Sequence, residues 1–102
     1  MPKMKVLLLP SAWMDLDRIS DYYLTMAGTN SAQKITDKIL DTIDMLKDYP
    51  YMGALHPDQL LAANGFRKAL CDDYVAVYKV IDSEVFIYRI VNGRTDYPKL
   101  LK

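Results

Sequence analysis

The sequence has few of the residues that mark extracellular, metal-binding or disulfide-stabilised proteins. Its 102 residues include one cysteine and one histidine. Cys71 alone can form no internal disulfide and leaves no cysteine pair for zinc, which suits a reducing compartment. We expect it to be a small buried apolar residue. His56 has no second histidine or carboxylate at ligand spacing, so we expect it to face solvent and predict neither a metal nor a cofactor.

Long apolar runs and an excess of one charge are also absent. Near the N-terminus the run from Val6 to Leu9 stops at Pro10, and a secretory signal needs roughly 7–15 apolar residues. No stretch approaches the roughly 20 apolar residues of a membrane span. Thirteen Lys and Arg balance thirteen Asp and Glu, so nucleic-acid contact, if any, must be local. We therefore expect a cytoplasmic protein with no membrane partner.

Apolar content is high enough for one packed domain covering residues 1–102, because 51% of the residues are hydrophobic. Val6 to Leu9 is typical of a short buried strand, and Ser11 is a candidate cap for a following helix. Two apolar stripes at helical spacing predict a helical hairpin that turns at Gly28. The stripes are Trp13, Leu16, Ile19, Tyr23 and Met26, then Ala32, Ile35, Ile39, Ile43 and Leu46.

The remaining chain changes to the period of strands. Residues 51–64 form an irregular connection with a helical turn near Gln59 to Ala62. Strands are predicted at Phe66 to Leu70, Tyr74 to Ile81 and Glu84 to Asn92. The order predicts an α+β fold, with an N-terminal strand, a helical hairpin and a three-stranded antiparallel meander. The helices would pack on one face of a four-stranded sheet and leave the other face available for function.

Most individual side chains suggest ordinary structural roles. Trp13 and the methionines are expected in the core, and the acidic residues of the first helix on its solvated face. Those residues are Asp15, Asp17 and Asp21. Tyrosines at alternate strand positions favour sheet packing over base stacking. They are Tyr74, Tyr78 and Tyr88.

Several short motifs follow one another in an order that resembles one family. They are Asp15-Leu16, Ile19-Ser20-Asp21-Tyr22-Tyr23, Tyr49-Pro50, Met52-Gly53, Gly65-Phe66-Arg67-Lys68, Tyr78-Lys79-Val80 and Asn92-Gly93-Arg94-Thr95-Asp96-Tyr97. Each motif is degenerate alone, but their order and spacing cover nearly the whole chain. On these motifs the sequence resembles the RelE/ParE toxins of bacterial type II toxin–antitoxin modules.

The resemblance implies a toxin that a cognate antitoxin, usually encoded beside it, wraps and neutralises. RelE-like members enter the ribosomal A site and cut messenger RNA, whereas ParE-like members poison DNA gyrase and are not known as nucleases. RNA cleavage requires removal of the 2′-hydroxyl proton, neutralisation of the phosphorane charge and protonation of the leaving oxygen. A cluster of Arg, Lys and Tyr can share these tasks.

The candidate catalytic residues apply only if the protein is RelE-like. Arg67 and Lys68 match basic positions of that branch, and Arg94 matches an arginine near the end of its fourth strand. Tyr97 or Lys79 would be the proton-transfer group. The alternative for Arg67, Lys68 and Arg94 is that they are simply solvated strand residues.

Two departures from the RelE-like pattern favour the ParE-like branch. Val75 occupies the position where RelE-like nucleases carry an arginine, and valine cannot stabilise a phosphate. The ending Gly93-Arg94-Thr95-Asp96-Tyr97 is similar to that of ParE-like members, in which an arginine and an aspartate follow the last strand. The sequence thus favours inhibition of DNA gyrase. Ribosome-dependent messenger RNA cleavage and a non-toxic module that only binds an antitoxin stay open as alternatives.

Overall fold

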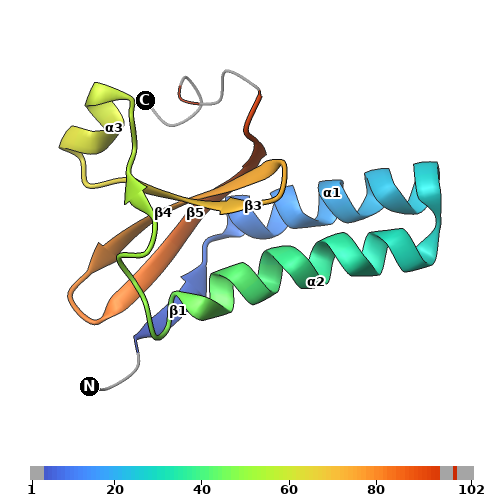
Figure 1. The fold of residues 1–102 in the computed structure, drawn as a ribbon, viewed down its shortest axis with the longest axis horizontal. Coiled ribbons are helices and arrows are strands. Elements are labelled where there is room, and N and C mark those ends of the chain that lie inside the picture. Colours follow the sequence, from blue (N-terminus) through green and yellow to red (C-terminus); the bar gives the residue numbers. More distant parts are fainter. Residues whose placement is uncertain (1–3, 95–97, 99–102) are drawn as a thin grey trace.

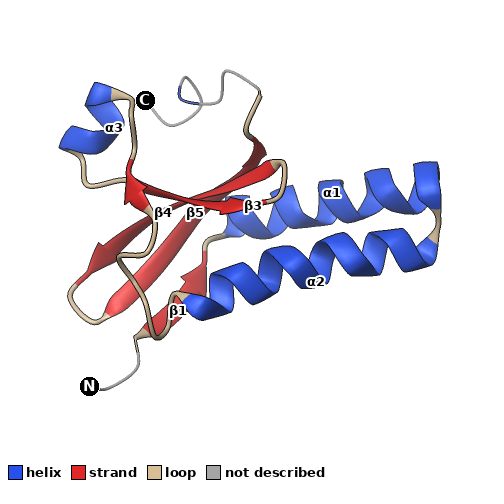
Figure 2. Ribbon diagram, viewed as in Figure 1, coloured by secondary structure: helices blue, strands red, loops and turns tan. Residues whose placement is uncertain are grey.

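The chain builds one mixed five-stranded sheet with helices on both faces (Figures 1 and 2). The structure, a computed structural model, describes residues 4–94 and Pro98. The strand order is β1-β5-β4-β3-β2. The elements along the chain are β1 (Lys5–Leu8), α1 (Pro10–Ala27), α2 (Thr29–Met45), β2 (Ala54–Leu55), α3 (Gln59–Ala63), β3 (Arg67–Cys71), β4 (Tyr74–Ile81) and β5 (Glu84–Asn92).

The antiparallel meander follows the expected strands closely. β4 and β5 have the predicted bounds, and β3 begins one residue later than predicted. Both hairpin turns place an aspartate in the left-handed region, with φ of 56° at Asp72 and 55° at Asp82. Aspartate tolerates this conformation because its short polar side chain can bond to nearby backbone. The period-two pattern and the turn residues therefore fix this part of the fold.

The expected four-stranded sheet is wrong in two respects. β1 pairs with β5 in parallel, because the helical hairpin carries the chain away from β1 before the meander begins. A fifth strand, β2, pairs with β3 at the opposite edge of the sheet. β2 is two residues long, too short to show alternation, and it lies in the segment that the sequence predicts to be an irregular connection.

The helical hairpin lies on one face of the sheet, and its tip extends beyond the strands (Figure 1). All five residues of the predicted α2 stripe are buried, and Gly28, with φ of 92°, joins the two helices. In α1 the predicted stripe is partly wrong. Trp13 is 50% exposed and Met26 is 68% exposed, whereas Ala12 is fully buried. Met26 lies near the projecting tip, where no strand covers it.

The placement of the methionines and of the first cap also differs from expectation. Met14, Met45 and Met52 are exposed, so the prediction that the methionines belong to the core is wrong for them. Helix α1 begins at Pro10 with Leu9 as its cap residue, two positions before the predicted Ser11 cap. Proline suits this first helical position because its missing N–H would have no intrahelical partner there.

Asp15 joins α1 to β5, which corrects the prediction that it is solvated. Its side chain is 6% exposed, and its carboxylate accepts hydrogen bonds from Arg89 Nε at 2.7 Å and Nη2 at 3.0 Å. It also accepts the backbone N–H of Ile90 at 2.9 Å. β1 pairs with β5 only as far as Ile87, so the carboxylate satisfies a strand N–H beyond the end of β1.

The second face of the sheet is partly covered rather than open. Helix α3 brings Leu61 against a small apolar cluster with Phe66, Val75, Val77 and Val91. The pairing of β4 with β5 shifts register between Val77 and Tyr78, which leaves Tyr88 as the extra residue of a β-bulge. No described helix is both long and apolar enough to cross a membrane.

His56 is 4% exposed, so the prediction that it faces solvent is wrong. Its backbone N–H donates to the carbonyl of Phe66, and its Nδ1 accepts the backbone N–H of Asp58 at 3.0 Å. Asp58 in turn caps α3 by accepting the backbone N–H groups of Leu60 and Leu61. Burial, and then the positive charge of Lys68, lower the pKa of His56, while Asp58 opposes them.

We predict that the Asp15 carboxylate is a main source of stability. Asp15→Ala leaves Arg89 and the Ile90 N–H without their acceptor, which should lower the free energy of unfolding by about 3 kcal/mol. Asp15→Asn keeps one acceptor oxygen and should cost less. Asp17 is exposed on the same helix, and Asp17→Ala should change the value by no more than about 0.5 kcal/mol. Equal urea midpoints for Asp15→Ala and Asp17→Ala would contradict this role.

We also predict an acid-sensitive contribution from His56. Folding favours its neutral form, so this contribution is fully present above the unfolded pKa of 6.5 and is lost as pH falls through the lower folded pKa. His56→Asn keeps an acceptor for the Asp58 N–H but does not titrate. The melting temperature of the variant should therefore fall less than that of the wild type between about pH 7.5 and 5.5. Parallel pH profiles would exclude this contribution.

Candidate functional site

The candidate residues of the sequence lie on two faces and at two ends of the sheet. Arg67, Lys68, Lys79 and Arg94 are described, whereas Tyr97 lies outside the described residues. Arg67 pairs with Tyr78 and Lys68 with Val77, so these two neighbours point to opposite faces of β3. Arg67 shares its face with the main core, and Lys68 shares its face with the cluster beneath α3.

Arg67 anchors the loop that precedes β2. Its Nη1 donates to the carbonyl oxygen of Gly53, and its guanidinium lies 4.9 Å from the ring centroid of Tyr51. A cation over an aromatic face is stabilised by the ring quadrupole. Arg67 is thus engaged with its own chain.

Tyr78 binds the same loop through its hydroxyl group. Its hydroxyl accepts the N–H of Gly53 at 3.0 Å and donates to the carbonyl of Pro50 at 2.8 Å. Burial raises the pKa of Tyr78 against the lowering effects of Gly53 and Arg67, so the hydroxyl keeps its proton. A Cβ on residue 53 would collide with the carbonyl oxygen of Lys68 and with this hydroxyl. Only glycine therefore fits between the tyrosine and β3.

Lys79 belongs to a cation–aromatic cluster on the second face. Its Nζ lies 4.3 Å from the ring centroid of Phe66 and 5.5 Å from that of Tyr88. The two rings meet edge to face, with centroids 4.9 Å apart. The two aromatic rings thus stabilise the charge of Lys79 on this face of the sheet.

Arg94 lies at the far end of the sheet from Lys79. Lys79 pairs with Phe86, while Asn92 pairs with Tyr74 beside the other turn, and the backbone N–H of Arg94 donates to the Asn92 side chain. Phe86 and Asn92 are six residues apart on β5, which corresponds to ~20 Å at about 3.3 Å per residue. Lys68 pairs with Val77, so Lys68 and Lys79 share one face and are diagonal neighbours across β3 and β4. The four described candidates nevertheless do not form one cluster, because Arg67 points to the other face and Arg94 lies at the other end.

Two further features bear on proton and phosphate chemistry. Val75, at the position of the nuclease arginine, is buried in the cluster beneath α3. Burial, and then a hydrogen bond with Tyr23, raise the pKa of Tyr74 to about 12, so its phenol is a poor base near neutral pH. No group of three metal-ligating side chains occurs within the described part of the chain.

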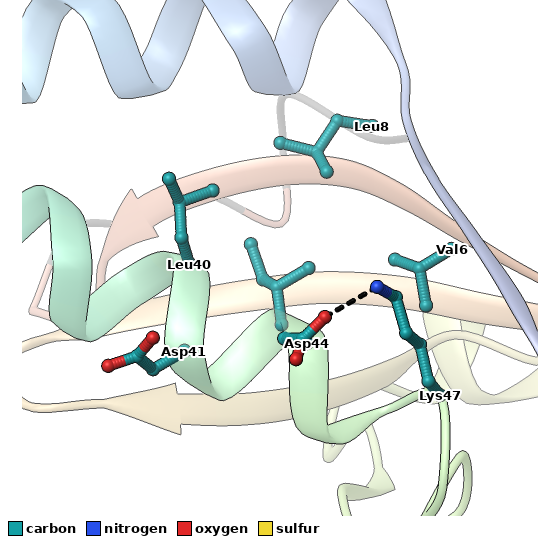
Figure 3. Close-up of a pocket in the computed structure, with 7 residues that line it drawn as sticks. Val6, Leu8, Leu40, Asp41, Asp44 and Lys47 are labelled. Carbon is teal, nitrogen blue, oxygen red and sulfur yellow. Dashed lines mark ion pairs between the residues drawn. The ribbon is translucent and has the colours of Figure 1, made fainter.

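A groove opens between β1 and α2 at one edge of the sheet (Figure 3). Its apolar walls come from Val6 and Leu8 on β1 and from Leu40 and Ile43 on α2. Asp41 and Asp44 line the same groove, and Asp44 pairs with Lys47 at 2.6 Å. Among the described residues no strand pairs with the outer side of β1. The groove therefore lies beside a free strand edge, and we name it the β1 groove.

A second groove of about 410 Å³ lies at the opposite edge. It is bounded by the loop before β2, by β2 and by β3, and we name it the β3 groove. Its lining residues are Met52, Gly53, Ala54, Lys68, Ala69 and Leu70. Sequence reasoning missed both grooves, because each joins segments far apart in the chain.

The comparisons with known proteins agree with this architecture. Residues 6–97 match the family model of the ParE toxin of the type II toxin–antitoxin system parDE. A chain of the chromosomal ParDE system from P. aeruginosa superposes with a TM-score of 0.75 and 26% identity. The match covers 88% of this chain and 96% of that one. No curated protein matches the sequence.

A second solved structure shows the same fold at lower identity. It is a chain of the RelBE2 toxin–antitoxin complex from Mycobacterium tuberculosis, with a TM-score of 0.67 and 19% identity over 88% of this chain and 98% of that one. The family model covers nearly all of the described sheet and both long helices. The chain therefore belongs to the ParE toxin family of type II toxin–antitoxin systems, within the RelE/ParE superfamily.

Proposed function

We propose that this toxin arrests growth in the cytoplasm by inhibiting DNA gyrase, and that a cognate antitoxin neutralises it. The observation that carries the proposal is that Arg67 and Arg94 are separated from the neighbouring pair Lys68 and Lys79. Arg67 anchors a loop, Lys79 lies over two aromatic rings, and Arg94 lies ~20 Å from Lys79 along the strand. This arrangement favours a toxin that acts by binding a protein.

This separation argues against RNA cleavage on physical grounds. Stabilising a phosphorane requires donors about 3 Å from the developing charge, so residues at opposite ends of a sheet cannot serve one phosphate. Val75 adds to the argument because a buried valine offers neither a charge nor a donor. Messenger RNA cleavage would need its catalytic groups to be supplied in another way.

Variants at two of the basic candidates separate the mechanisms. Lys79→Met keeps the apolar contact with Phe66 and Tyr88, and we expect it to arrest growth and inhibit gyrase supercoiling like the wild type. Arg94→Ala removes an arginine typical of the ParE-like branch. It should weaken supercoiling inhibition about tenfold, equivalent to ~1.4 kcal/mol of binding. For each variant, inhibition of supercoiling is measured with purified gyrase. Growth arrest and cleavage of ribosome-bound messenger RNA are measured after the toxin is induced without its antitoxin.

Each of the other outcomes identifies a different function. Cleavage of ribosome-bound messenger RNA by the wild type, abolished in Lys79→Met, would show a RelE-like nuclease. Growth without arrest, together with intact antitoxin binding, would show a non-toxic binding module. Arrest with neither gyrase inhibition nor RNA cleavage would exclude both toxin mechanisms.

We propose that the antitoxin occupies the β1 groove. The apolar side chains of Val6, Leu8, Leu40 and Ile43 provide a floor, and the free edge of β1 offers backbone groups to an added strand. Peptides that bind by strand addition use such an edge for main-chain hydrogen bonds and adjacent pockets for alternate side chains. The relatives of known structure named above come from toxin–antitoxin systems, which supports an antitoxin partner.

Leu40→Lys tests this contact by placing a charge in the apolar wall. We expect it to weaken antitoxin binding by at least about tenfold, because a buried contact worth more than ~1.4 kcal/mol is lost. The matched control is Met26→Lys at the hairpin tip, away from the groove, which should bind like the wild type. Titration calorimetry measures both variants, and thermal unfolding verifies that each remains folded. Equal affinities for the two variants would place the antitoxin elsewhere.

A further inference from the structure

We infer that the β3 groove is the surface with which the toxin holds its target, and that it takes an extended protein segment carrying apolar side chains and a carboxylate. This inference rests on the proposed inhibition of gyrase and adds the chemistry of the contact. It concerns the edge of the sheet opposite to the β1 groove. Three features of this edge support the inference: the shape of the groove, its free backbone groups and its charge.

The shape of the groove is built into the fold. Tyr78 and Arg67 bind the N–H and the carbonyl of Gly53, which packs directly against the backbone of Lys68 on β3. Met52 and Leu70 line the groove and are 41% and 67% exposed. Two large apolar side chains thus stand in solvent beside a groove whose backbone is held in place, which is typical of a protein contact.

The backbone of β3 has a free edge within this groove. The two-residue turn makes Cys71 and Tyr74 a hydrogen-bonded pair, so the N–H and C=O groups of Leu70, one residue earlier, point away from β4. β2 pairs with Lys68 and Arg67 only, and no other described strand pairs with β3 on this side. An extended segment can therefore continue the sheet where β2 ends.

The charge of the residues that line the β3 groove favours a negatively charged segment. Lys68 is the only charged residue among those that line the groove. The β1 groove differs, because two aspartates and one lysine line it, and the lysine, Lys47, pairs with Asp44. A segment with a carboxylate therefore fits the β3 groove, lined by one positive charge, better than the β1 groove, whose lining charges leave Asp41 unbalanced. The two edges of the sheet are therefore suited to different partners.

The test uses purified DNA gyrase as the probe and the full-length toxin immobilised. Leu70→Lys removes an exposed apolar contact, and Lys68→Glu reverses the charge in the groove. We expect each to weaken gyrase binding by at least about tenfold and to leave antitoxin binding within about twofold of the wild type. Met26→Lys is the matched control, since Met26 is 68% exposed and Leu70 67% exposed. It should bind gyrase like the wild type.

The outcomes separate this inference from the proposed function. If the wild type does not bind gyrase, the proposed function is overturned and this assignment with it. If the wild type binds gyrase, and the single variants Leu70→Lys and Lys68→Glu each bind it as tightly as the wild type, only the assignment of the β3 groove is overturned. Loss of both gyrase and antitoxin binding in folded variants would also overturn it, because the edge would then serve the antitoxin. Should Leu70→Lys fail to fold, Lys68→Glu decides by the same criteria.

A second pair of variants tests the strand pairing itself. Leu70→Ala removes the leucine side chain but keeps the backbone N–H of residue 70. Leu70→Pro removes the leucine side chain and the backbone N–H. Proline is tolerated on edge strands where the N–H faces outward, so Leu70→Pro should remain folded. We expect Leu70→Pro to bind gyrase about tenfold more weakly than Leu70→Ala. Equal affinities for the two folded variants would overturn the strand-pairing mode.

Discussion

The three hydrogen bonds accepted by the Asp15 carboxylate hold the two layers of the protein together. They join the first half of α1 to β5 at the point where β1 ends, so the helix cannot rotate or slide without leaving Arg89 and the Ile90 N–H unsatisfied. A buried charge costs several kcal/mol unless such partners surround it. α2 packs along α1, and together with β1 it lines the β1 groove.

A second buried polar group has a comparable role at the other edge. The Tyr78 hydroxyl bonds to both Pro50 and Gly53, which shapes the loop above β3. The aromatic ring lies in the main core while the hydroxyl reaches the opposite edge from the β1 groove. In both places one buried polar side chain therefore joins segments that are distant in sequence.

Periodicity predicted the parts of the fold that depend on local pattern. The α2 stripe and the bounds of β4 and β5 follow from apolar spacing and turn residues. Asp15 could not be placed by pattern, because its burial depends on Arg89, 74 residues away. One signal was present: Asp15 lies one helical turn from both Ala12 and Ile19, on the buried face. His56 is similar, since its burial depends on Phe66 and Asp58.

The candidate site shows the same division between local and distant information. Strand alternation alone already places Arg67 and Lys68 on opposite faces, but the distance from Lys79 to Arg94 depends on the strand register, which includes a bulge at Tyr88. Because the described basic candidates do not all meet at one point, we infer binding surfaces at the edges of the sheet. Free strand edges are normally an aggregation hazard and need cover. In a toxin whose partners supply that cover, two edges with different charge allow one small sheet to bind two different proteins.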